Sequence, residues 1–148
     1  MTEEQVTKAI LKWLLDNNWE IVCFDFPQSG TGRLLHPNGS TEKNKDAINP
    51  DIVAVKNGVC LFFENKDRYY LPDFEKQSAL INENNYSDAI RELLANYEVD
   101  RILYGIGLPD NKYCGGAVDN RDLVDFIVGV NNERNAFFLF DKHRISIE

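Results

Sequence analysis

The sequence has little cysteine, little histidine and no paired metal-ligand motif. Its three cysteines, Cys23, Cys60 and Cys114, stand far apart without a Cys-x-x-Cys pair. This spacing argues against a disulfide framework and favours a reduced, intracellular protein. Its two histidines, His36 and His143, have no metal-ligand spacing to each other or to a cysteine, so we expect solvated loop residues.

Basic residues and long apolar runs are also scarce. Sixteen Lys and Arg stand against 24 Asp and Glu, for a net charge of −8. Such a balance argues against a protein that coats polyanions in general, but it allows an enzyme that meets nucleic acid at a local patch. The longest apolar runs, such as residues 59–63, are far shorter than a bilayer span, and the first residues lack the pattern of a secretory signal. We therefore expect a cytoplasmic protein with no membrane partner.

The length and composition are those of one globular domain. A chain of 148 residues, 43% hydrophobic, buries roughly two-thirds of its unfolded surface, so it folds without disulfides or structural metal. Collagen, coiled-coil, disordered and multi-span membrane classes are excluded by composition and pattern. We see no internal repeat or linker, and we expect residues 1–148 to form a single domain.

Local patterns predict alternating helices and strands. Thr2 is a candidate N-cap, with Gln5 as its capping-box partner. Asn57-Gly58 between two apolar runs is a strong hairpin signal. The segment 27–50, rich in Gly, Ser, Asn and Pro, is expected to be a long functional loop, and residues 109–120 a Gly-rich connection. The expected helices are 2–17, 72–81, 87–97 and 122–130, and the expected strands are 19–26, 51–55, 59–66, 99–108 and 136–140. This order predicts an α/β fold, a three-layer α/β/α sandwich with a central mixed sheet.

The hairpin carries the informative polar residues. Glu64 and Lys66 are two residues apart, so they project from the same face of a strand. Asp51 opens the partner strand. Six positions separate Asp51 from Asn57, and six separate Gly58 from Glu64, so a tight turn brings the two carboxylates to the same end of the sheet.

Two carboxylates held close repel unless a cation neutralises them. Mg²⁺ suits this task because it binds one or two carboxylates and keeps several waters. A bound ion also screens a phosphate under attack, while Lys66 orients or deprotonates the attacking water or stabilises charge on the phosphate. The combination predicts a phosphodiester hydrolysis site.

The motif Pro50-Asp51, then twelve residues, then Glu64-Asn65-Lys66 resembles the PD-(D/E)xK nuclease superfamily, which has the restriction-endonuclease-like fold. That family typically adds an acidic residue on its first helix. Glu3 fits, since it is in phase with the apolar face, whereas Glu4 points about 100° away. In the branches that resemble Holliday-junction resolvases and virus-type replication-repair nucleases, a glutamine often follows in the next helix, and Gln77 supplies one.

The resemblance implies a metal-dependent DNA endonuclease of restriction, repair or junction-resolving type. Mg²⁺, with Mn²⁺ as a substitute, would be held by Glu3, Asp51, Glu64 and the backbone carbonyl of Asn65. The implied catalytic residues are Asp51, Glu64, Lys66 and Gln77. The implied substrate is duplex or branched DNA, with RNA as a weaker alternative, and a homodimer would serve duplex cleavage because that needs two cuts.

Several readings stay open from the residues alone. The replication-repair branch usually has Gly before Pro-Asp, where this chain has Asn49, and the loop 27–50 is long for a minimal resolvase. Arg33 or His36 in that loop could contact substrate, and the cations nearest the motif are Lys66, Arg68 and Lys76. Each of these residues could also be ordinary: Asp51 the start of a strand after a turn, Glu3 a favourable helix-end charge, Gln77 a surface residue and Lys66 a partner of Glu64. The rival function is a catalytically inactive nuclease fold that acts as a protein- or nucleic-acid-binding module.

Overall fold

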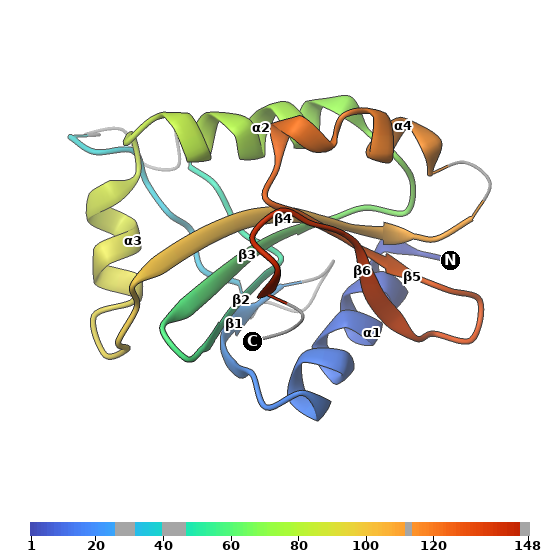
Figure 1. The fold of residues 1–148 in the computed structure, drawn as a ribbon. Coiled ribbons are helices and arrows are strands. Elements are labelled where there is room, and N and C mark those ends of the chain that lie inside the picture. The colour runs from blue at the N-terminus through green and yellow to red at the C-terminus, as the bar shows by residue number, and fades with distance from the viewer. Residues whose placement is uncertain (26–31, 40–46, 112–113, 146–148) are drawn as a thin grey trace.

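In the computed structural model, which describes residues 1–25, 32–39, 47–111 and 114–145, a six-stranded sheet forms the middle layer (Figure 1). Its strands run in sequence order across the sheet: β1 (Glu20–Phe24), β2 (Ile52–Lys56), β3 (Val59–Asn65), β4 (Arg101–Pro109), β5 (Phe126–Val130) and β6 (Ala136–Asp141). The pairs β3–β4 and β4–β5 are parallel, and the others are antiparallel. The sheet is therefore mixed, as the sequence predicts.

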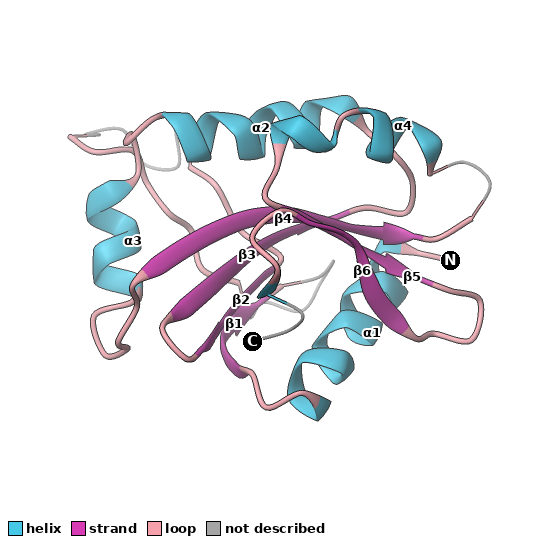
Figure 2. Ribbon diagram, in the orientation of Figure 1, coloured by secondary structure: helices cyan, strands magenta, loops and turns pink. Residues whose placement is uncertain are grey.

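Helices cover both faces of the sheet (Figure 2). Helix α1 (Glu3–Asp16) lies on one face, and α2 (Leu71–Asn82), α3 (Ser87–Leu93) and α4 (Gly115–Asp119) lie on the other. This arrangement confirms the predicted α/β fold with three layers. None of the helices in the described ranges is long and apolar enough to cross a membrane.

Helix α1 begins where its capping signal places it. The Gln5 N–H donates to the Thr2 hydroxyl (3.1 Å), and the Thr2 N–H donates to Oε1 of Gln5 (2.9 Å). The inward face of the helix, carried by Val6, Ile10 and Leu14, is fully buried against the sheet. Each of these side chains contributes roughly 1.5–3 kcal/mol through burial, which fixes the helix and the position of its first turn.

The β2–β3 hairpin has a two-residue turn. Asn57 and Gly58 both have positive φ, 50° and 81°, as the primed turns of tight hairpins require. Lys56 pairs with Val59, and the ladder continues to Ile52 opposite Phe63. The next position outward brings Asp51 opposite Glu64, as the sequence predicts.

The prediction of a helix over residues 122–130 is wrong. Only a 3-10 turn, η1 (Arg121–Leu123), forms there, and Phe126–Val130 is the strand β5, buried along its whole length. Periodicity does not separate a short, fully buried strand from a buried helix segment, and parallel pairing with β4 decides the outcome. The short helix α4 forms inside the expected connection 109–120, where no helix was predicted.

Two other segments differ from expectation. The second helix of the pair, α3, ends at Leu93 rather than Tyr97. Its first turn is held by Asn38, whose Oδ1 accepts from the Asp88 N–H (3.0 Å) and whose Nδ2 donates to the Asn84 carbonyl (2.9 Å). His143 is half-buried, with Nε2 lying 3.0 Å from Oδ1 of the buried Asp125, so it is more than a solvated loop residue.

The close contact between β4 and β5 predicts a strict need for glycine at position 105. A Cβ there would clash with the ring of Phe126, which is fully buried. We expect Gly105→Ala to lower the free energy of unfolding by about 1–3 kcal/mol, as overpacking does. Urea unfolding measures this. Gly115→Ala is the control, because no described atom lies within 4 Å of its added Cβ; equal losses in the two variants would contradict the packing argument.

Candidate functional site

Asp51 is anchored between two strands at one end of the sheet. Its N–H donates to the Phe63 carbonyl (3.0 Å), and its own carbonyl accepts from the Asp25 N–H (2.8 Å). Its side-chain Oδ2 accepts from the Asn65 N–H (2.7 Å). The carboxylate is therefore fixed next to the end of β3, beside the position of Glu64.

Burial and mutual repulsion disfavour ionisation of the two acids. Burial, followed by the negative charge of Glu64, raises the pKa of Asp51 to about 8, although the hydrogen bond from the Asn65 N–H works in the opposite direction. Burial also raises the pKa of Glu64, against the opposing charge of Lys76. A pair of acids in this state is stabilised by any cation that binds both.

Two lysines stand beside the acids. The Lys76 ammonium lies 3.2 Å from Oε2 of Glu64. The Lys66 ammonium lies 3.7 Å from Oδ2 of Asp73, an ion-pair distance rather than a hydrogen bond, and 4.9 Å from the centre of the Tyr70 ring. Lys66 is thus held at the rim between a carboxylate and an aromatic face, and burial raises the pKa of its partner Asp73.

Glu3, rather than Glu4, belongs to this end of the sheet. Burial raises the pKa of Glu3, the charge of Lys66 opposes that rise, and the charge of Glu3 in turn raises the pKa of Asp51. Glu4 forms an exposed ion pair with Lys8 (3.2 Å) along the helix surface. The helical phase therefore separates the two neighbouring acids as the sequence predicts.

Gln77 is buried, not a surface residue. Its Nε2 donates to the main-chain carbonyls of Gly105 (2.7 Å) and Phe62 (3.2 Å). These bonds tie α2 to β3 and β4. The side chain also lines a small cavity together with Glu64 and Lys76. The predicted role of orienting Lys66 stays a prediction, whereas the anchoring of the helix is visible in the hydrogen bonds.

The side chain of Asn65 points to the opposite face of the sheet from Glu64. Its Nδ2 donates to the Thr7 hydroxyl (3.0 Å) under α1, and its Oδ1 is buried without a hydrogen-bond partner in the described part of the chain. Its N–H is the group that reaches Asp51. The side chain therefore locks α1 to β3, which leaves only the main chain of Asn65 for the candidate site.

Sequence reasoning missed two acids at this end of the sheet. Asp25 follows β1, donates its N–H to the Asp51 carbonyl and accepts from Nδ2 of Asn49 (2.7 Å). Asp73 lies one helical turn before Gln77 and pairs with Lys66. The spacing of Asp73 and Gln77, four residues apart in a predicted helix, was the available signal, since such residues share a helix face.

The donor set fits a hard divalent cation. Asp51 and Glu64 offer carboxylate oxygens side by side, and Mg²⁺ in proteins commonly takes one or two carboxylates and completes its shell with water and phosphate. Among the residues that the structure describes, no group of three or more His, Cys, Asp or Glu side chains lies in position to hold a metal ion. Asp51 and Glu64 are thus two neighbouring carboxylates, and the charge of Glu3 raises the pKa of Asp51.

The long loop reaches the site only in part. Asn49 and Pro50 lead directly into Asp51, but residues 26–31 and 40–46 lie outside the described ranges. Arg33 and His36 are exposed and line a hollow against α3 together with Asp88 and Glu92. The expectation that they contact substrate stays a prediction.

The raised pKa of Asp51 predicts a pH-dependent cost to stability. In the unfolded chain this carboxyl titrates near pH 4, and in the folded protein at about 8. Between these values the folded state holds a proton that the unfolded state has lost, so stability falls as pH rises through the window. Asp51→Asn keeps an acceptor for the Asn65 N–H and removes the charge.

We expect metal-free wild-type protein to lose about 1–3 kcal/mol more than Asp51→Asn between about pH 5 and pH 8.5, by urea unfolding in EDTA. Asp16→Asn, at an exposed acid paired with Lys12, is the matched control and should follow the wild type. If the free energy of unfolding follows the same pH profile in the wild type and in Asp51→Asn, ionisation of Asp51 does not destabilise the folded protein, and the prediction is wrong.

The buried amide of Gln77 predicts a structural loss on truncation. Gln77→Ala removes two hydrogen bonds and leaves a cavity under α2, so we expect about 2–4 kcal/mol of destabilisation in urea. Glu75→Ala, on the exposed side of the same helix, should change stability by less than about 1 kcal/mol. Unchanged stability in Gln77→Ala would leave only a role at the site.

No protein-family model matches the sequence, and no curated protein matches it significantly. Among solved structures, the chain is similar to the crystal structure of a FdxN element excision controlling factor protein from Anabaena variabilis. The two are 15% identical over 93% of this chain and 99% of that chain, with a TM-score of 0.46. A likeness of this size establishes neither a family nor a function for the chain.

Proposed function

We propose that this protein is a Mg²⁺-dependent phosphodiesterase that cleaves DNA, as its resemblance to PD-(D/E)xK nucleases implies. The observation that carries the proposal is the hairpin register, which puts the half-buried acids Asp51 and Glu64 next to each other at one sheet end. Lys66 follows Glu64 at the spacing of the motif. These are the parts that phosphodiester hydrolysis needs, gathered in one place.

In this proposal Asp51 and Glu64 hold the cation, with the Asn65 carbonyl as a further ligand and Glu3 as a nearby charge. When bound, the ion would lower the pKa of a coordinated water and screen the phosphate. The protein contributes a fixed geometry, because the hydrogen bond from the Asn65 N–H already holds the Asp51 carboxylate in place. Burial of both acids strengthens their attraction for a cation.

In this proposal the Lys66 ammonium orients the attacking water and stabilises the negative charge that develops on the phosphate. Its ammonium is restrained between Asp73 and the Tyr70 ring, so it stays at the rim where a phosphate would lie. During hydrolysis the water oxygen loses a proton to solvent and forms a bond to phosphorus. The bond from phosphorus to the leaving oxygen breaks, and that oxygen takes up a proton from solvent. A fixed positive charge stabilises the extra negative charge that develops on the phosphate oxygens.

The test is metal-dependent cleavage by matched variants. We expect Asp51→Asn, Glu64→Gln and Lys66→Ala each to lower Mg²⁺-dependent cleavage by about a hundredfold or more. Glu3→Gln should lower it less, and Glu4→Gln, at the neighbouring exposed acid, should leave it unchanged. Duplex, single-stranded, flap and branched DNA, with RNA beside them, are compared at one salt concentration, since affinity for nucleic acid depends strongly on salt. Wild-type rates in Glu64→Gln would overturn the proposal.

One feature favours the rival function of a non-catalytic binding module. Glu64 already has a cationic partner in Lys76, so the site is partly neutralised by the chain itself. Calorimetric titration with Mg²⁺ and with Mn²⁺ separates the two functions. Metal binding that is lost in Glu64→Gln supports the enzyme, and absence of any metal binding by the wild type supports the module.

A further inference from the structure

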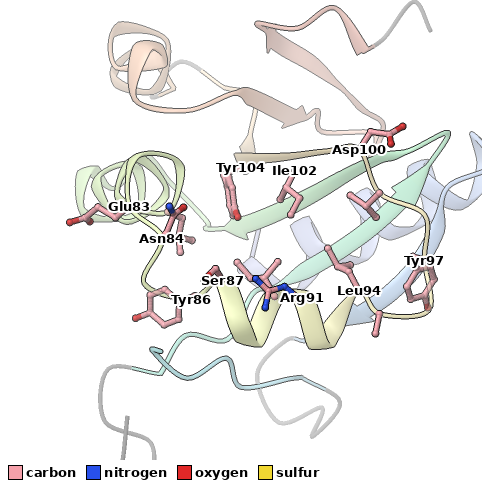
Figure 3. A pocket seen from close by; sticks show the side chains of 14 residues that line it. Glu83, Asn84, Tyr86, Ser87, Arg91, Leu94, Tyr97, Asp100, Ile102 and Tyr104 are labelled. Carbon is pink, nitrogen blue, oxygen red and sulfur yellow. The ribbon is translucent and has the colours of Figure 1, made fainter. Parts of the chain in front are cut away.

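A cavity of about 440 Å³ lies between the end of α2, helix α3 and the first half of β4 (Figure 3). Asp51, Glu64 and Lys66 are not among the described residues that line it. Much of its wall is apolar or aromatic, and these side chains are Leu80, Ile90, Leu94, Tyr97, Ile102 and Tyr104. The volume falls in the range of small-molecule sites, which is roughly 300–1,000 Å³. The cavity is therefore a candidate binding site separate from the one at the end of the hairpin.

The hydroxyl of Tyr104 is a polar group on the strand side of this cavity. Tyr104 is only 7% exposed, and its ring packs against that of Phe62, with 5.2 Å between the ring centres. The side chain extends from β4 toward α3, so its hydroxyl points into the cavity (Figure 3). The main-chain N–H of Tyr104 donates to Oδ2 of Asp125 (2.9 Å), but its hydroxyl has no hydrogen-bond partner among the residues that the structure describes. Buried tyrosine hydroxyls usually have a partner, so a bound molecule with a suitable atom would complete this one.

The state of this hydroxyl selects the kind of atom that would pair with it. Burial raises the pKa of Tyr104 to about 12, so the group is protonated at neutral pH and offers a hydrogen-bond donor. A donor among apolar walls favours a ligand that carries an acceptor, such as a carbonyl oxygen. An apolar ligand in the same place would leave the donor unpaired and cut off from water, which costs free energy.

The charged residues of the lining disfavour an anionic ligand. Glu83 and Asp100 bring two negative charges, and Arg91 brings one positive charge, so the lining carries a net charge of 1 − 2 = −1. The guanidinium of Arg91 is also paired with Asp88, at 3.5 Å from its Oδ1. A negative potential repels carboxylates and phosphates, and a neutral molecule avoids that cost.

We propose that this cavity binds a small, neutral, ring-containing molecule whose carbonyl-type oxygen accepts a hydrogen bond from the Tyr104 hydroxyl. The ring of the ligand lies between the strand residues Ile102 and Tyr104 and the helix residue Leu94, whose side chains face one another (Figure 3). Contact with these apolar and aromatic groups supplies affinity, and the single hydrogen bond fixes the orientation. The proposal does not depend on the nuclease function, since it uses none of the residues of that site.

The test uses two probe molecules of nearly the same shape. Acetophenone carries a carbonyl oxygen where α-methylstyrene carries a methylene group. Each probe is titrated into the whole protein, and binding is followed through the NMR signals of isoleucine and leucine methyl groups. We expect acetophenone to bind the wild type, with the largest changes at Ile102 and Leu94, which line the cavity.

Tyr104→Phe removes the hydroxyl and keeps the ring. The quantity measured is the Kd of α-methylstyrene divided by the Kd of acetophenone, and comparing this ratio between variants cancels the different hydrophobicity of the two probes. We expect the ratio to fall about threefold to tenfold in Tyr104→Phe, the effect of losing one neutral hydrogen bond. Tyr97→Phe is the matched control and should keep the wild-type ratio, because Tyr97 lines the cavity with its hydroxyl directed away from Tyr104 (Figure 3).

Either of two results overturns the proposal. One is that acetophenone, up to its solubility limit, leaves the methyl signals of Ile102 and Leu94 in the wild type unchanged. The other is that Tyr104→Phe, shown to be folded by circular dichroism and thermal melting, keeps the wild-type ratio of the two Kd values. Neither result bears on DNA cleavage, so the nuclease proposal stands or falls by its own experiment.

Discussion

The two-residue turn of the β2–β3 hairpin sets the relative positions of the two acids at the candidate site. Because Asn57 and Gly58 both adopt positive φ, the β2 and β3 strands leave the turn in one register, and that register makes Asp51 the neighbour of Glu64. A slip of one residue would send every side chain of a strand to the opposite face of the sheet. The positions of the two acids at the far end of the hairpin thus depend on the conformation of a turn six residues away. The apolar β2–β3 ladder keeps one register over that distance.

Two of the acids at this end of the sheet are paired with lysine side chains. Glu64 faces Lys76 and Asp73 faces Lys66, whereas the Asp51 carboxylate accepts a hydrogen bond from the Asn65 N–H. Burial, followed by the charge of Glu64, outweighs that hydrogen bond and raises the pKa of Asp51. A cation bound beside Asp51 would favour the ionised form of this carboxyl.

Features that depend on neighbours in the chain are predicted well from the sequence, whereas features that depend on tertiary contacts are predicted poorly. The capping box at Thr2 and the Asn57-Gly58 turn depend on neighbours in the chain, and both form as expected. The local pattern predicts a helix over residues 122–130, but Phe126–Val130 is a strand because it pairs with β4, more than twenty residues earlier. At the site, alternation along β3 predicts the common face of Glu64 and Lys66. The contact of Gln77 with main-chain carbonyls, and the pairing of Asp73 with Lys66, depend on how α2 sits on the sheet, which no local pattern encodes.

The side chain of Asn38 links two parts of the chain that the sequence keeps about fifty residues apart. Helix α3 spans only seven residues, too few to be stable by itself, and its first turn relies on that distant amide. Whatever displaces Asn38 therefore removes these hydrogen bonds from the start of α3. A change confined to the exposed surface around Asn38 would thus reach a helix that lies about fifty residues further along the chain.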